Sequence, residues 1–135
     1  MAIYELTGAH RDVDGRVVHQ IRATETLIER GITTGDLGGW IQKTSNVIDR
    51  GWVGEDAVVM DDAEVSGDSQ VRHRARVEGT AKIRKSAVIY DDAVITEDAL
   101  VDDDSTVGGD ARVGAGCRLY VDTHLRAGTW PITSS

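Results

Sequence analysis

The chain has 135 residues, of which 40% are hydrophobic and 28% charged, a balance typical of one globular domain and not of a membrane-embedded or disordered protein. Fifteen Lys and Arg against 23 Asp and Glu give a net charge of −8, which argues against direct binding to nucleic acid or anionic lipid because both need a positive field. The absence of Phe and the single cysteine, Cys117, exclude a bulky aromatic core, an internal disulfide and a cysteine-based zinc site.

Residues 1–38 form the first predicted unit and carry no repeat. Residues 3–8 and 16–27 are typical of two strands, and Asp12-Val13-Asp14-Gly15 between them is typical of a hairpin turn. The opening residues lack the basic and apolar regions of a secretory signal, and no stretch of the chain approaches about 18 apolar residues. We therefore expect a cytoplasmic protein without a membrane span, whose first residues form a hairpin that caps the structure behind it.

Residues 39–128 repeat every six residues. Each sixth residue is aliphatic, and from residue 57 onward the residue two places earlier is Ala, Ser, Thr or Cys. The aliphatic column consists of Ile41, Val47, Val53, Val59, Val65, Val71, Val77, Ile83, Ile89, Ile95, Val101, Val107, Val113, Leu119 and Leu125. Fifteen aliphatic residues at fifteen consecutive positions exclude a chance pattern.

A period of six does not fit an α-helix, but it fits a short strand followed by a tight corner. In the segment 81–86, Ala81 and Ile83 would point inward while Lys82 and Arg84 point outward. Asp and Gly are frequent three residues after each member of the aliphatic column, and we expect them at the corners because they tolerate unusual backbone angles. Three segments close a triangle, so one coil takes 18 residues, and five coils stacked about 4.8 Å apart give a prism about 24 Å long.

Residues 129–135 form the last predicted unit, a C-terminal cap or tail. Pro131 stands where the next aliphatic residue is due and cannot donate to a strand ladder, so we expect Trp130 to cover the last coil. Cys117 falls in the column of small residues, where we expect it to be buried and inert.

The repeat is similar to the hexapeptide repeat, whose members fold as left-handed parallel β-helices. Residues 4–8 (YELTG), 15–23 (GRVVHQIRA) and 35–41 (GDLGGWI) resemble the head of the YdcK-like hexapeptide-repeat proteins of bacteria and their phages. The resemblance implies an all-β fold, a left-handed parallel β-helix of about five triangular coils with an N-terminal β-hairpin cap, and a homotrimer. Proteins of this kind are often described as acyltransferases, so the resemblance also implies that activity, although the description rests on the fold alone.

Charged residues 18 positions apart would stack on successive coils, and they are mostly complementary. The stacked columns are Glu55–His73–Asp91, Asp56–Arg74–Asp92, Glu64–Lys82, Arg84–Asp102 and Lys85–Asp103. We interpret them as a ladder that fixes the register of the coils, because mis-stacking would bring like charges together. The alternative is an anion-binding site at Arg72, His73 and Arg74.

Catalytic and metal sites are not favoured. Hexapeptide acyltransferases use a histidine as general base beside a loop that interrupts the coil, and by resemblance His73 or His124 would serve. No insertion interrupts residues 57–128 and no C-terminal helix is expected to cover acyl-CoA, so we predict neither catalysis nor a cofactor and keep the acyltransferase as an alternative. The carboxylates at 102–104 and 122 suit calcium chemically but match no recognised loop, and we predict no metal.

Apolar residues also stand at positions that the repeat assigns to solvent, and contiguous exposed apolar side chains usually mark an interface. These residues are Val58, Val88, Tyr90, Val94 and Leu100. Val58 and Val94 are expected on one face with Arg76 between them. We predict a non-catalytic binding module, phage-related and homo-oligomeric, that binds a host protein or a small ligand on its flat faces or between subunits; the further alternative is a structural protein of the virion.

Overall fold

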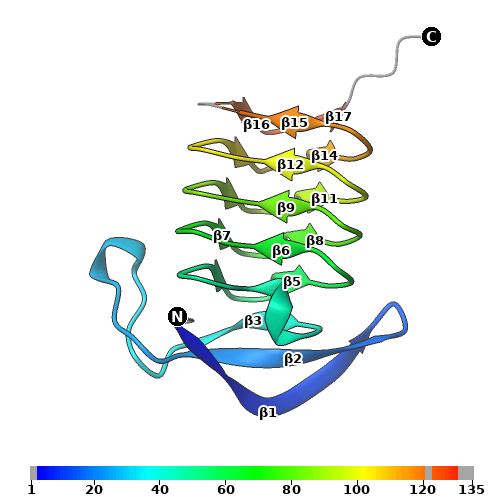
Figure 1. Ribbon diagram of the computed structural model, residues 1–135. Coiled ribbons are helices and arrows are strands. Elements are labelled where there is room, and N and C mark those ends of the chain that lie inside the picture. The colour runs from blue at the N-terminus through cyan, green and yellow to red at the C-terminus, as the bar shows by residue number, and fades with distance from the viewer. Residues whose placement is uncertain (1–2, 121–122, 131–135) are drawn as a thin grey trace, which may run out of the picture.

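Short strands stacked at a spacing of 18 residues build the protein in a computed structural model, which describes residues 3–120 and 123–130. The strands form a β-solenoid of about five coils whose N-terminal end is closed by an antiparallel hairpin (Figure 1). The predicted all-β solenoid with a hairpin cap is confirmed. Among the described residues, no helix has the length and apolar character needed to cross a membrane.

Three parallel ladders form the walls of the solenoid. Face A contains β3 (Leu37–Ile41), β5 (Val58–Val59), β8 (Arg76–Val77), β11 (Val94–Ile95), β14 (Arg112–Val113) and β17 (Thr129–Trp130). Face B contains β4 (Trp52–Val53), β7 (Gln70–Val71), β10 (Val88–Ile89), β13 (Thr106–Val107) and β16 (His124–Leu125). Face C contains β6 (Glu64–Val65), β9 (Lys82–Ile83), β12 (Leu100–Val101) and β15 (Arg118–Leu119). Two short 3-10 helices, η1 (Ile28–Arg30) and η2 (Thr44–Asn46), lie before the first complete coil.

The aliphatic column fills the interior, as the period predicts. Its members from Ile41 to Val113 are at most 1% exposed, and the small residues between them, such as Ala81 and Ser105, are buried with them. Each aliphatic side chain packs on the one 18 residues away, as Val65, Ile83 and Val101 do on face C. A narrow core of branched side chains and alanines therefore takes the place of the missing aromatic core.

The corners differ in detail from the sequence prediction. From residue 49 to residue 109 the residue with positive φ lies two positions after the aliphatic column, whereas Gly116 and Gly128 lie three positions after it, as predicted. The residue is often not glycine: φ is 55° at Asp49, 49° at Glu55 and 61° at His73. At five of these positions the side chain accepts the backbone N–H of the corresponding corner in the next coil, as Asp49 does from Gly67 at 3.2 Å; the others are Glu55, Asp61, His73 and Asp91. A carboxylate at this position therefore satisfies a backbone donor that glycine would leave to water.

The last coil is also shorter than predicted. Arg112 pairs with Thr129 and Val113 with Trp130, a spacing of 17 residues. Trp130 therefore continues the ladder of face A in the place predicted for residue 131, and is not a separate lid. Pro131 and the rest of the predicted tail, 131–135, lie outside the described residues.

The hairpin joins β1 (Tyr4–Val13) to β2 (Arg16–Ala23) through a turn at Asp14 and Gly15, whose positive φ values of 51° and 83° suit the tight hairpin turn predicted there. Strand β2 pairs with β3, so the hairpin extends face A below the first coil. The first strand is longer than the predicted 3–8, and the distal half of the hairpin, residues 10–18, projects as an arm beside the lowest coils (Figure 1).

The arm packs on the outer surface of face A. Val18 is fully buried against Val58 and Met60, which the repeat points outward. The arm is also held by ion pairs from Asp14 to Arg76 and from Arg16 to Asp61, the latter at 2.9 Å. One part of the solenoid wall is therefore covered by the chain itself.

Candidate functional site

The predicted interface residues do not form one patch. Val58 is 4% exposed beneath the arm, so its predicted availability to a partner is wrong, because the arm occupies that surface. Val94 lies on face A above it, with Arg76 between them as predicted. The other three lie elsewhere: Val88 and Tyr90 lie on or just after the face B strand β10, and Leu100 lies on face C.

The candidate catalytic histidines are engaged in contacts between coils. His73 is half exposed; its Nε2 lies 3.5 Å from Glu55, and its Nδ1 accepts the backbone N–H of Asp91 at 3.1 Å. The Nδ1 atom of His124 lies 2.7 Å from the hydroxyl of Thr106. Each contact joins residues 18 positions apart in successive coils, so both histidines serve the stacking of the solenoid.

The charge ladder predicted from the 18-residue coil is present except at Asp56, which forms no ion pair with Arg74 in the described part of the chain. Arg74 forms a bidentate pair with Asp92, at 2.8 and 3.0 Å. The other columns pair His73 with Glu55 and Asp91, Lys82 with Glu64, Arg84 with Asp102, and Lys85 with Asp103. Burial raises the pKa of the Asp102 carboxyl, but hydrogen bonds from Arg84 and the Asp103 N–H, with the nearby positive charges, bring that pKa below its usual value.

The residues of the suggested anion site are all neighbours of carboxylates. Arg72 donates to Gln70 at 2.7 Å and to the carbonyl of Arg30 at 3.1 Å, and it lies 3.4 Å from Glu55. Since His73 and Arg74 face carboxylates as well, an incoming anion would have to displace internal partners. The geometry favours the register ladder over the anion site.

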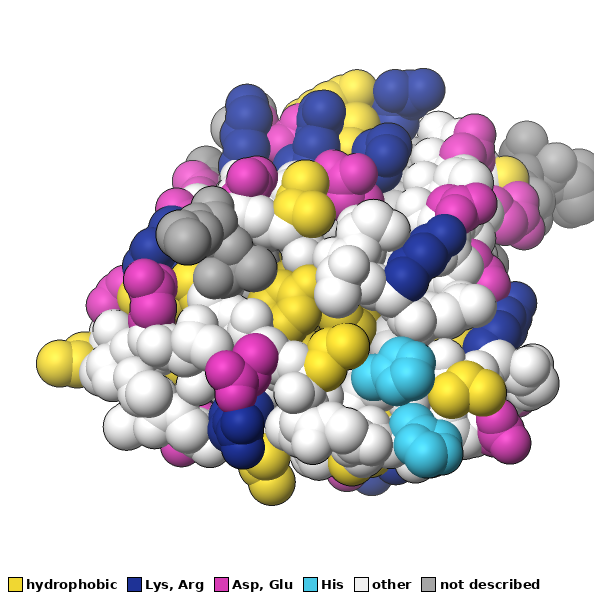
Figure 2. Space-filling view, turned by 60° about the horizontal axis from the view of Figure 1, so that its bottom comes forward, with side chains coloured by type: hydrophobic (Ala, Val, Ile, Leu, Met, Phe, Trp, Pro, Cys, Tyr) yellow, Lys and Arg dark blue, Asp and Glu magenta, His cyan; other side chains and the backbone are white. Residues whose placement is uncertain are grey.

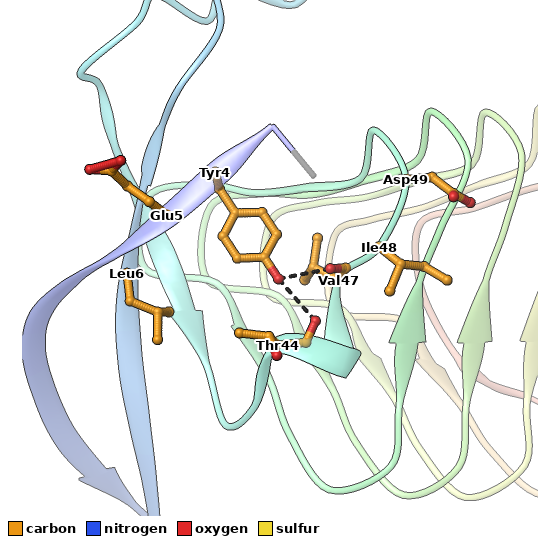
Figure 3. A pocket seen from close by; sticks show the side chains of 7 residues that line it. All are labelled: Tyr4, Glu5, Leu6, Thr44, Val47, Ile48 and Asp49. Carbon is orange, nitrogen blue, oxygen red and sulfur yellow. Dashed lines mark hydrogen bonds between the residues drawn. The ribbon is translucent and has the colours of Figure 1, made fainter. Parts of the chain in front are cut away.

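A cavity of about 390 Å³ that the sequence reasoning did not find lies where the cap meets the first coil (Figure 3). Strand β1 supplies one wall, while η2 and the corner that follows it supply the other (Figure 3). The lining residues are Tyr4, Glu5, Leu6, Thr44, Val47, Ile48 and Asp49.

Tyr4 fixes the shape of this cavity. Its ring extends from β1 toward the corner (Figure 3), and its hydroxyl donates to the carbonyl oxygens of Thr44 at 2.9 Å and Val47 at 2.8 Å. Burial raises the pKa of the Tyr4 phenol, so the group stays protonated and remains a donor. The tyrosine thereby joins residues 40 and 43 positions apart and holds the cap against the coil.

The cavity combines apolar walls with a negatively charged rim. Leu6 is 44% and Ile48 37% exposed, and the buried Val47 lies between the walls. Of the two rim carboxylates, Glu5 is paired with Arg22, whereas Asp49 uses one oxygen to accept the Gly67 N–H. The other Asp49 oxygen makes no hydrogen bond within the described part of the chain.

One signal for this cavity was present in the sequence. Ile48 directly follows Val47 of the aliphatic column, and Tyr90 was noted for the same outward position after Ile89.

Comparison with known proteins adds nothing to the geometry: no family model matches the chain, and no curated protein matches it.

Proposed function

We propose that the protein is a non-catalytic binding module whose cap cavity receives an apolar side chain lying next to a positive charge on a protein partner. The carrying observation is the concave site formed by Tyr4, Leu6 and Ile48, with Asp49 at its rim. A largely apolar pocket with a few converging polar groups is the usual form of a binding site.

The charge of the molecule supports a basic partner. The chain carries a net charge of −8, which attracts a cationic surface and speeds its encounter. At the cavity, the free oxygen of Asp49 would accept a hydrogen bond from an ammonium or guanidinium group, while Leu6 and Ile48 cover the neighbouring alkyl or aromatic surface.

The experiment is a pair of titrations with n-hexylammonium and n-hexanesulfonate, followed by NMR. The two probes share an alkyl chain and differ in the sign of their charge. We expect the ammonium probe to shift signals of residues 4–6 and 47–49 and to bind at least several-fold more tightly than the sulfonate.

The matched variants are Ile48→Lys and Tyr120→Lys. Both residues directly follow an aliphatic-column residue on a partly exposed surface, but only Ile48 lines the cavity. We expect Ile48→Lys to weaken binding of n-hexylammonium at least tenfold and Tyr120→Lys to leave it within twofold. Equal binding of the two probes, or equal losses in the two variants, would contradict the proposal.

We also propose that the protein self-associates as a trimer. We further propose that it is related to the YdcK-like hexapeptide-repeat proteins, so that its coil is left-handed and its origin phage-related. The six-residue period supports the kinship, and Val88 with Tyr90 supplies apolar surface for a trimer. Light scattering should give a mass well above the monomer's 14.6 kDa, and Val88→Glu with Val94→Glu should lower it. A monodisperse monomer at tens of micromolar would refute the trimer, and saturable binding of acyl-CoA would favour the enzyme instead.

A further inference from the structure

We propose that His10 and His19 form a binding pair for a divalent transition metal ion of the kind that prefers imidazole, namely Cu²⁺, Ni²⁺ or Zn²⁺. The pair lies on the arm, away from the cap cavity, so the inference does not depend on the proposed function.

The backbone brings the two histidines together. His10 on β1 is the cross-strand partner of His19 on β2, and its position follows an irregularity in the pairing between Leu6 and His10. Side chains directly opposite one another in an antiparallel pair have Cβ atoms about 4.5–5.5 Å apart. The imidazole ring centroids are 6.4 Å apart, with an angle of 53° between the ring planes.

The histidine pair lies on the face of the arm opposite Val18. The next pair along the hairpin, Arg11 and Val18, points the other way: Arg11 lies 4.4 Å from the centre of the Trp40 ring, and Val18 is buried on the solenoid. Because side chains alternate between the two faces of a strand, His10 and His19 lie on the face opposite Arg11 and Val18. His10 is exposed and His19 is partly exposed there. Figure 2 shows two adjacent histidine side chains at the end of the molecule that the hairpin covers.

The ring nitrogens of this pair are available to a ligand. Over residues 3–120 and 123–130, neither His10 nor His19 makes a side-chain hydrogen bond or lies within ion-pair distance of a carboxylate, unlike His73 and His124. A metal ion could therefore bind these ring nitrogens without first breaking a hydrogen bond or ion pair within the described residues.

The separation of the rings suits one shared ion. Two imidazoles that bind one metal ion at about 2.0–2.1 Å have ring centroids about 4.5 Å apart at a right angle and about 5.2 Å apart at the tetrahedral angle. From the observed 6.4 Å, rotation about the side-chain torsions has to bring the rings roughly 1–2 Å closer. No group of three or more metal-ligating side chains occurs in the part of the chain that the structure describes. Water or a group from a binding partner would therefore complete the coordination.

Binding here would clamp the two strands of the arm together. The opposite face of the arm is held to the coils by Val18 and by the Asp14–Arg76 and Arg16–Asp61 pairs. An ion that binds the folded hairpin and not the unfolded chain stabilises the hairpin by mass action. The metal would thus reinforce the arm from the face opposite these contacts.

Electron paramagnetic resonance of the full chain with one equivalent of Cu²⁺ tests the assignment. We expect the hyperfine pattern of two imidazole nitrogens. This two-nitrogen pattern should be absent from both His10→Asn and His19→Asn and retained in the controls His73→Asn and His124→Asn. Isothermal titration with Ni²⁺ should show at least a tenfold weaker affinity in each arm variant, with circular dichroism unchanged. A single-nitrogen spectrum in the wild type, or a two-nitrogen pattern that survives in both arm variants, would overturn the proposal.

Discussion

Replacing Ile83 tests whether the alternation between interior and exterior is the basis of the fold. Ile83 is fully buried in the middle of face C, between Val65 and Val101. Ile83→Ala removes three carbons at about 0.8 kcal/mol each, and a cavity contribution is added because the hydrogen-bonded coils above and below cannot close the gap. We therefore expect a loss of about 3 kcal/mol of unfolding free energy, within the range of about 2–5 kcal/mol for such substitutions.

The preceding residue supplies the control. Lys82 points outward, half exposed, with its Nζ atom 3.7 Å from Glu64, and an exposed pair of this kind contributes at most about 1 kcal/mol. In urea unfolding followed by far-ultraviolet circular dichroism, with a slope of about 2 kcal/mol per molar, Ile83→Ala should lower the midpoint by about 1.5 M and Lys82→Ala by less than about 0.5 M. Ile83→Asp should not fold, whereas Lys82→Asp should. If the two aspartate variants behave alike, the inward and outward assignments are wrong.

Three further predictions concern single contacts. Arg74→Glu should lower the melting temperature, less so at high salt, and adding Asp92→Arg should restore part of the loss; no recovery would contradict the pairing of coils. Burial raises the pKa of the Cys117 thiol, so iodoacetamide should modify it at least tenfold more slowly at pH 7 in the folded protein than in urea, and equal rates would show that the site is open. The hydrogen bond and charge of Arg76 lower the pKa of the Asp14 carboxyl, so its contribution to stability is complete above about pH 4 and is lost as the pH falls through the lowered folded value. The protection factors of the arm amides, taken relative to the intrinsic exchange rate at each pH, should fall over that range in the wild type but show no such step in Asp14→Asn.

The coils could be predicted because their signal is local and repeated. A residue such as Val65 needs only the position six places before or after it to reveal its inward direction, and the same spacing, taken three times, places Lys82 beside Glu64. At most corners the predicted positive-φ residue was one position too late, because Asp and Gly are frequent both at the positive-φ position and next to it. Which of two adjacent polar residues adopts positive φ depends on the next coil, whose backbone N–H groups donate to side chains such as that of Asp49.

The arm and the cavity could not be predicted in the same way. The burial of Val58 depends on the path of a hairpin about 40 residues earlier in the chain, and that path depends on the irregularity that follows Leu6. The cavity depends on the hydrogen bonds from Tyr4 to a corner that lies equally far along the sequence. Neither contact produces a periodic pattern in the sequence. Only the apolar character of Ile48, at an outward position, could have indicated a binding surface here.

The regular coil spacing makes the height of the molecule adjustable in fixed steps. Removing 18 residues above Arg76 would take out one layer of about 4.8 Å and leave every later side chain on its original face. Removing six would turn all later strands to the neighbouring face and break each charge column that crosses the junction. The ion pairs and the apolar contact that hold the arm involve residues up to Arg76, so neither change removes them. The solenoid can therefore act as a spacer whose length varies independently of the site at its base.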